Sequence, residues 1–210
     1  MKNNMTELVF ILDRSGSMHG YEADTVGGFN ATVEKQKAQE GKVYISTVLF
    51  NSESKVIHDR ADISEIERML PETYKVGGST ALLDAIGSAV HHIGNVHKYA
   101  RPEDVPEQTV FIIMTDGMEN ASHRYSADTV KAMIKRQKEK YGWEFIFLAA
   151  NIDAVGAAAH IGIESDRAAN YSQTHEGIDR SYRAVSSAIT HFRCEESRAK
   201  KINIGQFFED

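Results

Sequence analysis

Three oxygen-bearing side chains follow the first apolar run of the chain at alternate positions. They are Asp13, Ser15 and Ser17, and the run before them, 8–12, is typical of a strand buried on both faces of a sheet. A tight turn, which the small Gly16 permits, can aim the three side chains at one point. Converging hard oxygen donors suit a divalent cation such as Mg²⁺. Asp and Ser are also common after strands as turn residues and helix caps, so the triplet alone leaves both interpretations open.

Two distant segments favour the metal interpretation. In one, a paired-glycine turn delivers the hydroxyl of Thr80 just before an apolar pattern with helical spacing. In the other, a second apolar run, 109–115, ends in Asp116, much as the first run ends in Asp13. In an open parallel sheet, a crevice forms at the carboxyl ends of the strands where the connections change direction. We therefore expect both carboxylates to face that crevice.

In order and with suitable intervals, these segments resemble the three-part metal-ion-dependent adhesion site of the von Willebrand factor type A domain. The matching residues are Asp13, Ser15, Ser17, Thr80 and Asp116, and the resemblance covers about residues 6 to 192. It implies that Ser15, Ser17 and Thr80 coordinate Mg²⁺, or Mn²⁺ or Ca²⁺ in its place, through their hydroxyls. It also implies that Asp13 and Asp116 act mainly through bound waters.

This set of donors favours binding over bond cleavage. Three hydroxyls and two carboxylates held mainly through waters leave the cation under-neutralised, so an open position should attract an anionic oxygen. In the family that oxygen typically comes from an Asp or Glu of another protein, a contact worth on the order of a few kcal/mol. Asp84, just after Thr80, is expected to cap its helix rather than bind the metal. The residues expected to form the partner-binding rim are Met18, His19, Tyr21, Ser79, Glu119 and Asn120.

Other classes of function stay open. A Mg²⁺-dependent phosphohydrolase of the haloacid dehalogenase type also places an Asp after a first strand, but it uses a second Asp two positions later, where this chain has Ser15. A serine hydrolase needs a nucleophile elbow, and the stretch 13–17 lacks its leading glycine. We therefore expect no enzyme activity. The remaining alternative is a structural module whose metal only stabilises the loops.

Composition argues against several kinds of partner. No apolar run approaches the roughly 20 residues that span a bilayer, and residues 1–6 carry no hydrophobic region of a secretory signal. A net charge of −6 argues against nucleic acid, because phosphate neutralisation needs clustered Lys and Arg. The single Cys194 cannot form an internal disulfide, which agrees with a reducing compartment. We expect a cytoplasmic protein with a protein partner, and neither a membrane nor a nucleic acid as partner.

Strand-like and helix-like segments alternate along the chain. Strands are expected at 8–12, 43–50, 55–57, 109–115, 145–149 and 168–171, and helices at 22–40, 63–70, 81–97, 126–141, 154–160 and 178–192. This alternation predicts an α/β, three-layer, doubly wound Rossmann-like fold, with one antiparallel edge strand in a mostly parallel sheet and helices on both faces. We expect one domain over 1–192. The tail over 193–210 is expected to be frayed, or alternatively docked through Phe207 and Phe208 on its own domain or on another subunit.

Overall fold

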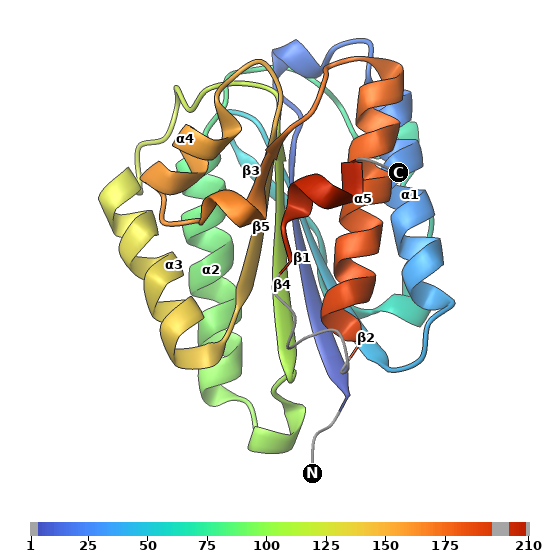
Figure 1. Ribbon diagram of the computed structural model, residues 1–210, viewed down its shortest axis with the longest axis vertical. Coiled ribbons are helices and arrows are strands. Elements are labelled where there is room, and N and C mark those ends of the chain that lie inside the picture. Colours follow the sequence, from blue (N-terminus) through green and yellow to red (C-terminus); the bar gives the residue numbers. More distant parts are fainter. Residues whose placement is uncertain (1–3, 195–201, 209–210) are drawn as a thin grey trace.

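The computed structural model describes residues 4–194 and 202–208, which form a six-stranded sheet between two layers of helices (Figure 1). The strands are β1 (Met5–Asp13), β2 (Lys42–Phe50), β3 (Ser54–Asp62), β4 (Gln108–Thr115), β5 (Glu144–Ala149) and β6 (Ala168–Asn170). Their order is β3-β2-β1-β4-β5-β6, and all neighbours are parallel except β2 and β3. The predicted doubly wound sheet with one antiparallel edge strand is confirmed, although β3 is longer than the return strand expected over 55–57.

The strands β1 and β4 lie side by side at the centre of the sheet. Every residue of both strands is buried, because helices cover both faces, and this explains why their sequences are apolar runs without alternation. The chain leaves β1 toward β2 on one side and leaves β4 toward β5 on the other. The connections therefore change direction between β1 and β4, where open parallel sheets bind ligands at their carboxyl ends.

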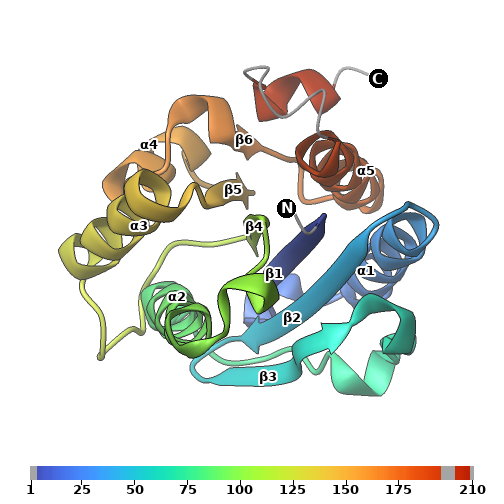
Figure 2. The same cartoon turned by 90° about the horizontal axis from the view of Figure 1, so that it is seen from below.

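Helices cover the two faces of the sheet (Figure 2). They are α1 (Glu22–Lys37), α2 (Leu82–Tyr99), α3 (Ala127–Tyr141), α4 (Ala154–His160) and α5 (His175–Arg193). Leu8, Phe10 and Leu12 of β1 belong to the core under α1 and α5, whereas Val9 and Ile11 belong to the core under α2, α3 and α4. Within the part of the chain that the structure describes, no helix is long and apolar enough to cross a bilayer.

The prediction of a helix over 63–70 is wrong. Only Ile63–Glu65 forms a turn of 3-10 helix, and the segment continues without regular secondary structure to residue 70. Asn30 of α1 explains the difference, because its side-chain nitrogen donates to the carbonyl oxygen of Met69 at 3.0 Å and its side-chain oxygen accepts from the Met69 N–H at 2.8 Å. These backbone groups are therefore bound by a distant side chain rather than by a helical turn.

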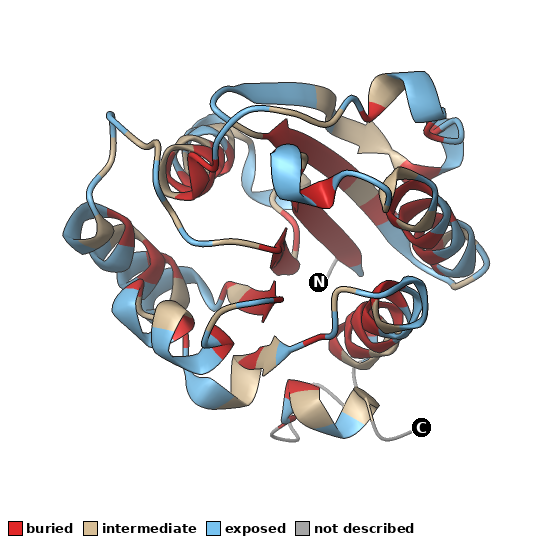
Figure 3. Cartoon of the chain, turned by 90° about the horizontal axis from the view of Figure 1, so that it is seen from above, coloured by how far each residue is buried: buried red, intermediate tan, exposed pale blue. Residues whose placement is uncertain are grey.

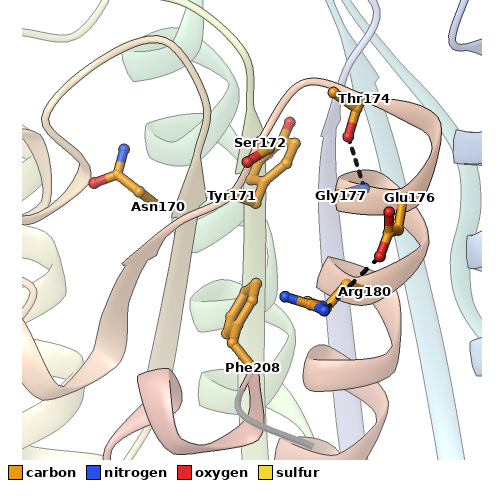
Figure 4. A pocket seen from close by; sticks show the side chains of 8 residues that line it. All are labelled: Asn170, Tyr171, Ser172, Thr174, Glu176, Gly177, Arg180 and Phe208. Carbon is orange, nitrogen blue, oxygen red and sulfur yellow. Dashed lines mark hydrogen bonds and ion pairs between the residues drawn. The ribbon is translucent and has the colours of Figure 1, made fainter.

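The C-terminal segment packs on the domain that precedes it. Ile202 and Ile204 are 2% and 0% exposed. The short 3-10 helix Ile204–Phe208 lies against α5 and β6, and Phe208 borders a hollow of about 350 Å³ beside the first turns of α5 (Figure 4). These contacts agree with the alternative in which the tail docks on its own domain; residues 195–201 and 209–210 of the tail lie outside the described residues.

Candidate metal centre

Asp13 is the last residue of β1 and is buried at the edge where the parallel strands end. Figure 3 looks onto this edge and shows the buried strand ends enclosed by more exposed loops. The Asp13 carboxylate accepts from the Ser15 N–H at 2.7 Å on Oδ1 and from Thr115 Oγ1 at 2.6 Å on Oδ2. Burial raises the pKa of Asp13 above its ordinary value, although both hydrogen bonds act in the opposite direction. The ionised carboxylate is therefore costly to keep at this position.

Two serine hydroxyls gather around Asp116, directly after β4. Ser17 Oγ donates to Asp116 Oδ1 at 2.7 Å, Ser15 Oγ donates to the same oxygen at 3.5 Å, and the two hydroxyls are 3.1 Å apart. Asp116 and Ser15 are 1% and 2% exposed, whereas Ser17 is exposed. A 3-10 turn, Gly16–Met18, reverses the backbone just after β1 and makes this approach possible.

The glycine turn brings Thr80 to the same place. The glycines at 77–78 have φ angles of 148° and 80°, which other residues rarely adopt, and the second accepts a hydrogen bond from the Gly16 N–H at 3.0 Å. A Cβ placed on Gly117 would lie 3.9 Å from both Ser17 Oγ and Thr80 Oγ1. The structure thus brings the five residues of the predicted metal site together at the carboxyl ends of the central strands.

Two buried tyrosines hold the ends of the strands beside the site. The Tyr74 hydroxyl donates to the backbone oxygen of Asp13, and the Tyr171 hydroxyl donates to that of Thr115 at 3.2 Å. Burial raises the pKa of both phenols well above the ordinary value, so both remain neutral donors. Packed donors of this kind keep the site-bearing backbone in a fixed position.

The donors around the two carboxylates fit a hard divalent cation. Among the described residues, Asp13 and Asp116 accept from hydroxyls, a backbone N–H and an amide, and no Lys, Arg or His forms an ion pair with either. Buried carboxylates without a positive partner are unfavourable, so a bound cation would stabilise them. The described part of the chain holds no cluster of three or more His, Cys, Asp and Glu side chains suited to a metal. Hydroxyl oxygens would therefore complete the coordination, as suits Mg²⁺.

Comparison with known proteins identifies the family. The sequence model of the von Willebrand factor type A domain matches residues 7–178, which is most of the chain. The chain belongs to the von Willebrand factor type A (VWA) domain family. A search of curated proteins found no match for this VWA domain.

Solved structures share the fold of this VWA domain. Proximal thread matrix protein 1 from the mussel byssus, in a structure with a zinc-occupied MIDAS motif, aligns with a TM-score of 0.61 and 14% identity over 88% of this chain and 46% of that one. A von Willebrand factor type A protein from Catenulispora acidiphila aligns with a TM-score of 0.58 and 13% identity over 89% of this chain and 42% of that one. This chain therefore spans less than half of either protein, and at these identities the likeness concerns the fold alone.

The residues expected at the rim differ in their exposure. His19, Ser79 and Asn120 are exposed, Tyr21 and Glu119 are half-buried, and Met18 is 4% exposed. The prediction that Met18 belongs to the rim is wrong. Its side chain lies inside the protein, near Leu12 and Met114, where a partner cannot reach it. Asn120 also has a local role, since its side-chain oxygen accepts from the Thr80 N–H at 2.9 Å.

Glu119 holds the start of α2. Its carboxylate accepts from the N–H of Leu83 at 2.8 Å and from those of residues 121–122 at 2.9 and 2.7 Å. Asp84 lies in the first turn of α2, where its charge favours the helix N-terminus as expected. Its carboxylate accepts from the N–H groups of residues 123–125, so Asp84 also ties the following loop to the start of α2. Burial acts to raise the pKa of Asp84, but these three backbone donors outweigh it and lower the pKa below its ordinary value.

Three residues outside the predicted set contact the candidate centre. Thr115 donates to Asp13 as described above, Gln173 Nε2 donates to Asp116 Oδ2 at 2.5 Å, and Asn151 Nδ2 donates to the backbone oxygen of Asp116 at 3.2 Å. All three lie at or just after the carboxyl ends of β4, β5 and β6. The strand-end rule covers Thr115, which ends the apolar run 109–115, but it gives no signal for Gln173 and Asn151, which lie in loops.

Proposed function

We propose that this VWA domain binds a divalent cation and uses it to hold an acidic side chain of a partner protein. Ser15, Ser17 and Thr80 would hold the cation through their hydroxyls, with Asp13 and Asp116 supplying negative charge. Mg²⁺ is the proposed ion, with Mn²⁺ or Ca²⁺ as substitutes. The bound ion would supply a positive charge that attracts the oxygen of an Asp or Glu from the partner. The observation that carries the proposal is the pair of buried carboxylates that, among residues 4–194 and 202–208, have only neutral partners, beside converging hydroxyls.

The family supports this proposal. VWA domains often mediate metal-dependent protein interactions, and the mussel protein described above carries zinc in its MIDAS motif. We propose a binding protein rather than an enzyme, because the donor set contains no second Asp at position 15 to protonate a leaving group. We also propose a cytoplasmic location. The net charge of −6 supports a protein partner over nucleic acid.

Metal uptake is the first test. Calorimetric titration with Mg²⁺, Mn²⁺ and Zn²⁺ would compare the wild type with Asp116→Ala and with the control Asp128→Ala, which changes an exposed carboxylate of α3. The proposal expects one ion per chain for the wild type and the control, and no uptake by Asp116→Ala. A wild type that takes up no divalent ion would overturn the proposal.

Partner capture is the second test. The tagged chain would be used to capture proteins from the native host in Mg²⁺ or in EDTA, alongside Asp13→Ala. Partners lost both with EDTA and with Asp13→Ala support a metal-bridged contact, whereas capture unaffected by either change points to a structural module. Hydrolysis of generic phosphate or acyl esters that requires both metal and Asp13 would instead establish an enzyme.

A further inference from the structure

The side chain of Gln173 connects two separate parts of the candidate metal centre. Gln173 lies between β6 and α5, and its Nε2 donates to Asp116 Oδ2 at 2.5 Å and to the backbone oxygen of Ser17 at 2.9 Å. Ser17 belongs to the turn after β1, and Asp116 follows β4. One amide group therefore bridges two loops that carry metal-site residues.

Asn151 fixes the orientation of this amide. Asn151 Nδ2 donates to Gln173 Oε1 at 2.5 Å and to the backbone oxygen of Asp116 at 3.2 Å. Asn151 has a φ of 59°, a left-handed conformation that Asn adopts more readily than most residues other than Gly. The Tyr21 hydroxyl holds the backbone of Gln173 by donating to its carbonyl oxygen at 2.8 Å. Because the side-chain oxygen of Gln173 accepts from Asn151, its nitrogen faces Asp116.

The two oxygens of Asp116 are divided between two sets of donors. Oδ1 accepts from Ser17 Oγ at 2.7 Å, within the hydroxyl cluster, whereas Oδ2 accepts from Gln173. We propose that Gln173, oriented by Asn151, is a positioning residue that keeps Oδ1 of Asp116 directed at the hydroxyl cluster. The inference rests on the proposed metal function. Loss of a hydrogen-bonding partner beyond the metal's own ligands commonly lowers metal affinity by about 10–100-fold.

The test compares three single variants. Gln173→Met removes the amide at nearly constant length, and Asn151→Gly removes the second amide while permitting the left-handed backbone. Gln39→Met is the matched control, because Gln39 is also partly buried and its amide donates to Thr190 Oγ1 at 2.7 Å, away from the site. The readouts are the Mn²⁺ dissociation constant from calorimetry and the midpoint of thermal unfolding in EDTA.

If Gln173 positions Asp116, the variants should bind metal more weakly than the wild type and not merely unfold more easily. We expect Gln173→Met to bind Mn²⁺ about 10-fold or more weakly than the wild type. Asn151→Gly should show a smaller loss of affinity, and Gln39→Met should bind Mn²⁺ as well as the wild type. The double variant should lose less affinity than the product of the two single losses, because Asn151 acts through Gln173.

Two outcomes would overturn this inference. If Gln173→Met lowers the midpoint in EDTA but leaves the dissociation constant unchanged, Gln173 only ties the loops together, and the proposed function stands without it. If the wild type binds no Mn²⁺, the proposed function and the inference are both overturned.

Discussion

Two buried carboxylates at opposite ends of β1 have different partners. Near the amino end, the Glu7 side chain is 0% exposed; Arg60 Nε donates to its two oxygens at 2.9 and 3.1 Å, and His97 Nε2 lies 2.7 Å from Oε2. At the carboxyl end, Asp13 is 2% exposed and accepts from a backbone N–H and a hydroxyl. Among the residues that the structure describes, basic groups meet the carboxylate at the amino end of β1 and only neutral donors meet the carboxylate at its carboxyl end.

The position of Arg60 makes this contrast informative. Arg60 has a φ of 48° and lies at an irregularity in the pairing of β2 with β3. A left-handed conformation costs a residue other than Gly about 1–3 kcal/mol, yet the backbone adopts it where Arg60 meets Glu7. The fold can therefore accommodate a basic partner for a buried carboxylate. The neutral surroundings of Asp13 and Asp116 are a particular property of the other edge, and they support the proposal that the cation there comes from outside the chain.

The largest expected effect comes from neutralising Glu7. In Glu7→Gln the Arg60 charge loses its buried partner, so we expect the free energy of unfolding to fall by about 3–5 kcal/mol. Urea denaturation measures this change, and Glu34→Gln, which breaks an exposed pair with Lys37, serves as the control. Divalent affinity should be unchanged in both variants. A Glu7→Gln protein as stable as the wild type would remove the contrast between the two ends.

A divalent cation should stabilise the protein through the carboxylates at the carboxyl end of β1 and not through Glu7. A cation present at 100 times its dissociation constant adds about 2.7 kcal/mol to the free energy of unfolding, which raises the thermal midpoint of a chain of this size by about 5–10 °C. Thermal unfolding in Mg²⁺ and in EDTA tests this. The increment should persist in Glu7→Gln and disappear in Asp116→Ala. An increment that survives in Asp116→Ala would place the stabilising ion elsewhere.

Asp13→Asn should make the metal-free protein more stable. The Asn oxygen can still accept from the Ser15 N–H, and its NH2 group can donate to Thr115 Oγ1 once that hydroxyl turns to donate to the carbonyl oxygen of Gly117, 3.2 Å away. The buried charge is removed, so we expect a gain of about 1 kcal/mol at neutral pH, or about 2–4 °C in the midpoint. Burial raises the folded-state pKa of Asp13, so its contribution to stability falls as the pH rises through that pKa. Urea denaturation in EDTA should therefore show the advantage of Asn shrinking toward acid pH. An advantage that is constant with pH would mean that the Asp13 charge is not its cause.

The fold was predictable where local signals agree with tertiary packing. The apolar runs of β1 and β4 and the periodic apolar face of α5 each require one kind of burial, and the structure places them accordingly. The segment 63–70 failed this test. Its apolar spacing also suits an irregular segment packed on the core, and Asn30, far away in the sequence, holds Met69 in that form.

The candidate site was predictable only where residues form a motif. Asp13 and Asp116 end apolar runs, and that position gives both a recognisable signal. Gln173 and Asn151 are single polar residues in loops, and their contacts with Asp116 span 57 and 35 positions. No spacing rule covers such contacts, since they depend on how the loops after β5 and β6 fold over the end of β4. Met18 was misjudged for a related reason, because the inward direction of a side chain in a short 3-10 turn depends on the packing beneath it.

The smallest expected effect is a shift in the pH dependence of metal uptake. Thr115→Val has a similar shape but lacks the hydroxyl that donates to Asp13, and that hydrogen bond lowers the pKa of the carboxyl against the effect of burial. Its loss should raise this pKa further and weaken Mn²⁺ binding about 2–10-fold. Since the cation needs the ionised carboxylate, the midpoint of uptake against pH should move upward.

Calorimetry across pH measures both the Mn²⁺ affinity and this midpoint. Thr47→Val is the control, because Thr47 is a buried strand threonine whose hydroxyl meets His58 instead. If affinity falls while the pH midpoint stays in place, the Thr115 hydroxyl acts on the geometry of Asp13 rather than on its pKa. The contrast with Glu7, whose partners are charged, would then not extend to the pKa of the carboxylate at this end of β1.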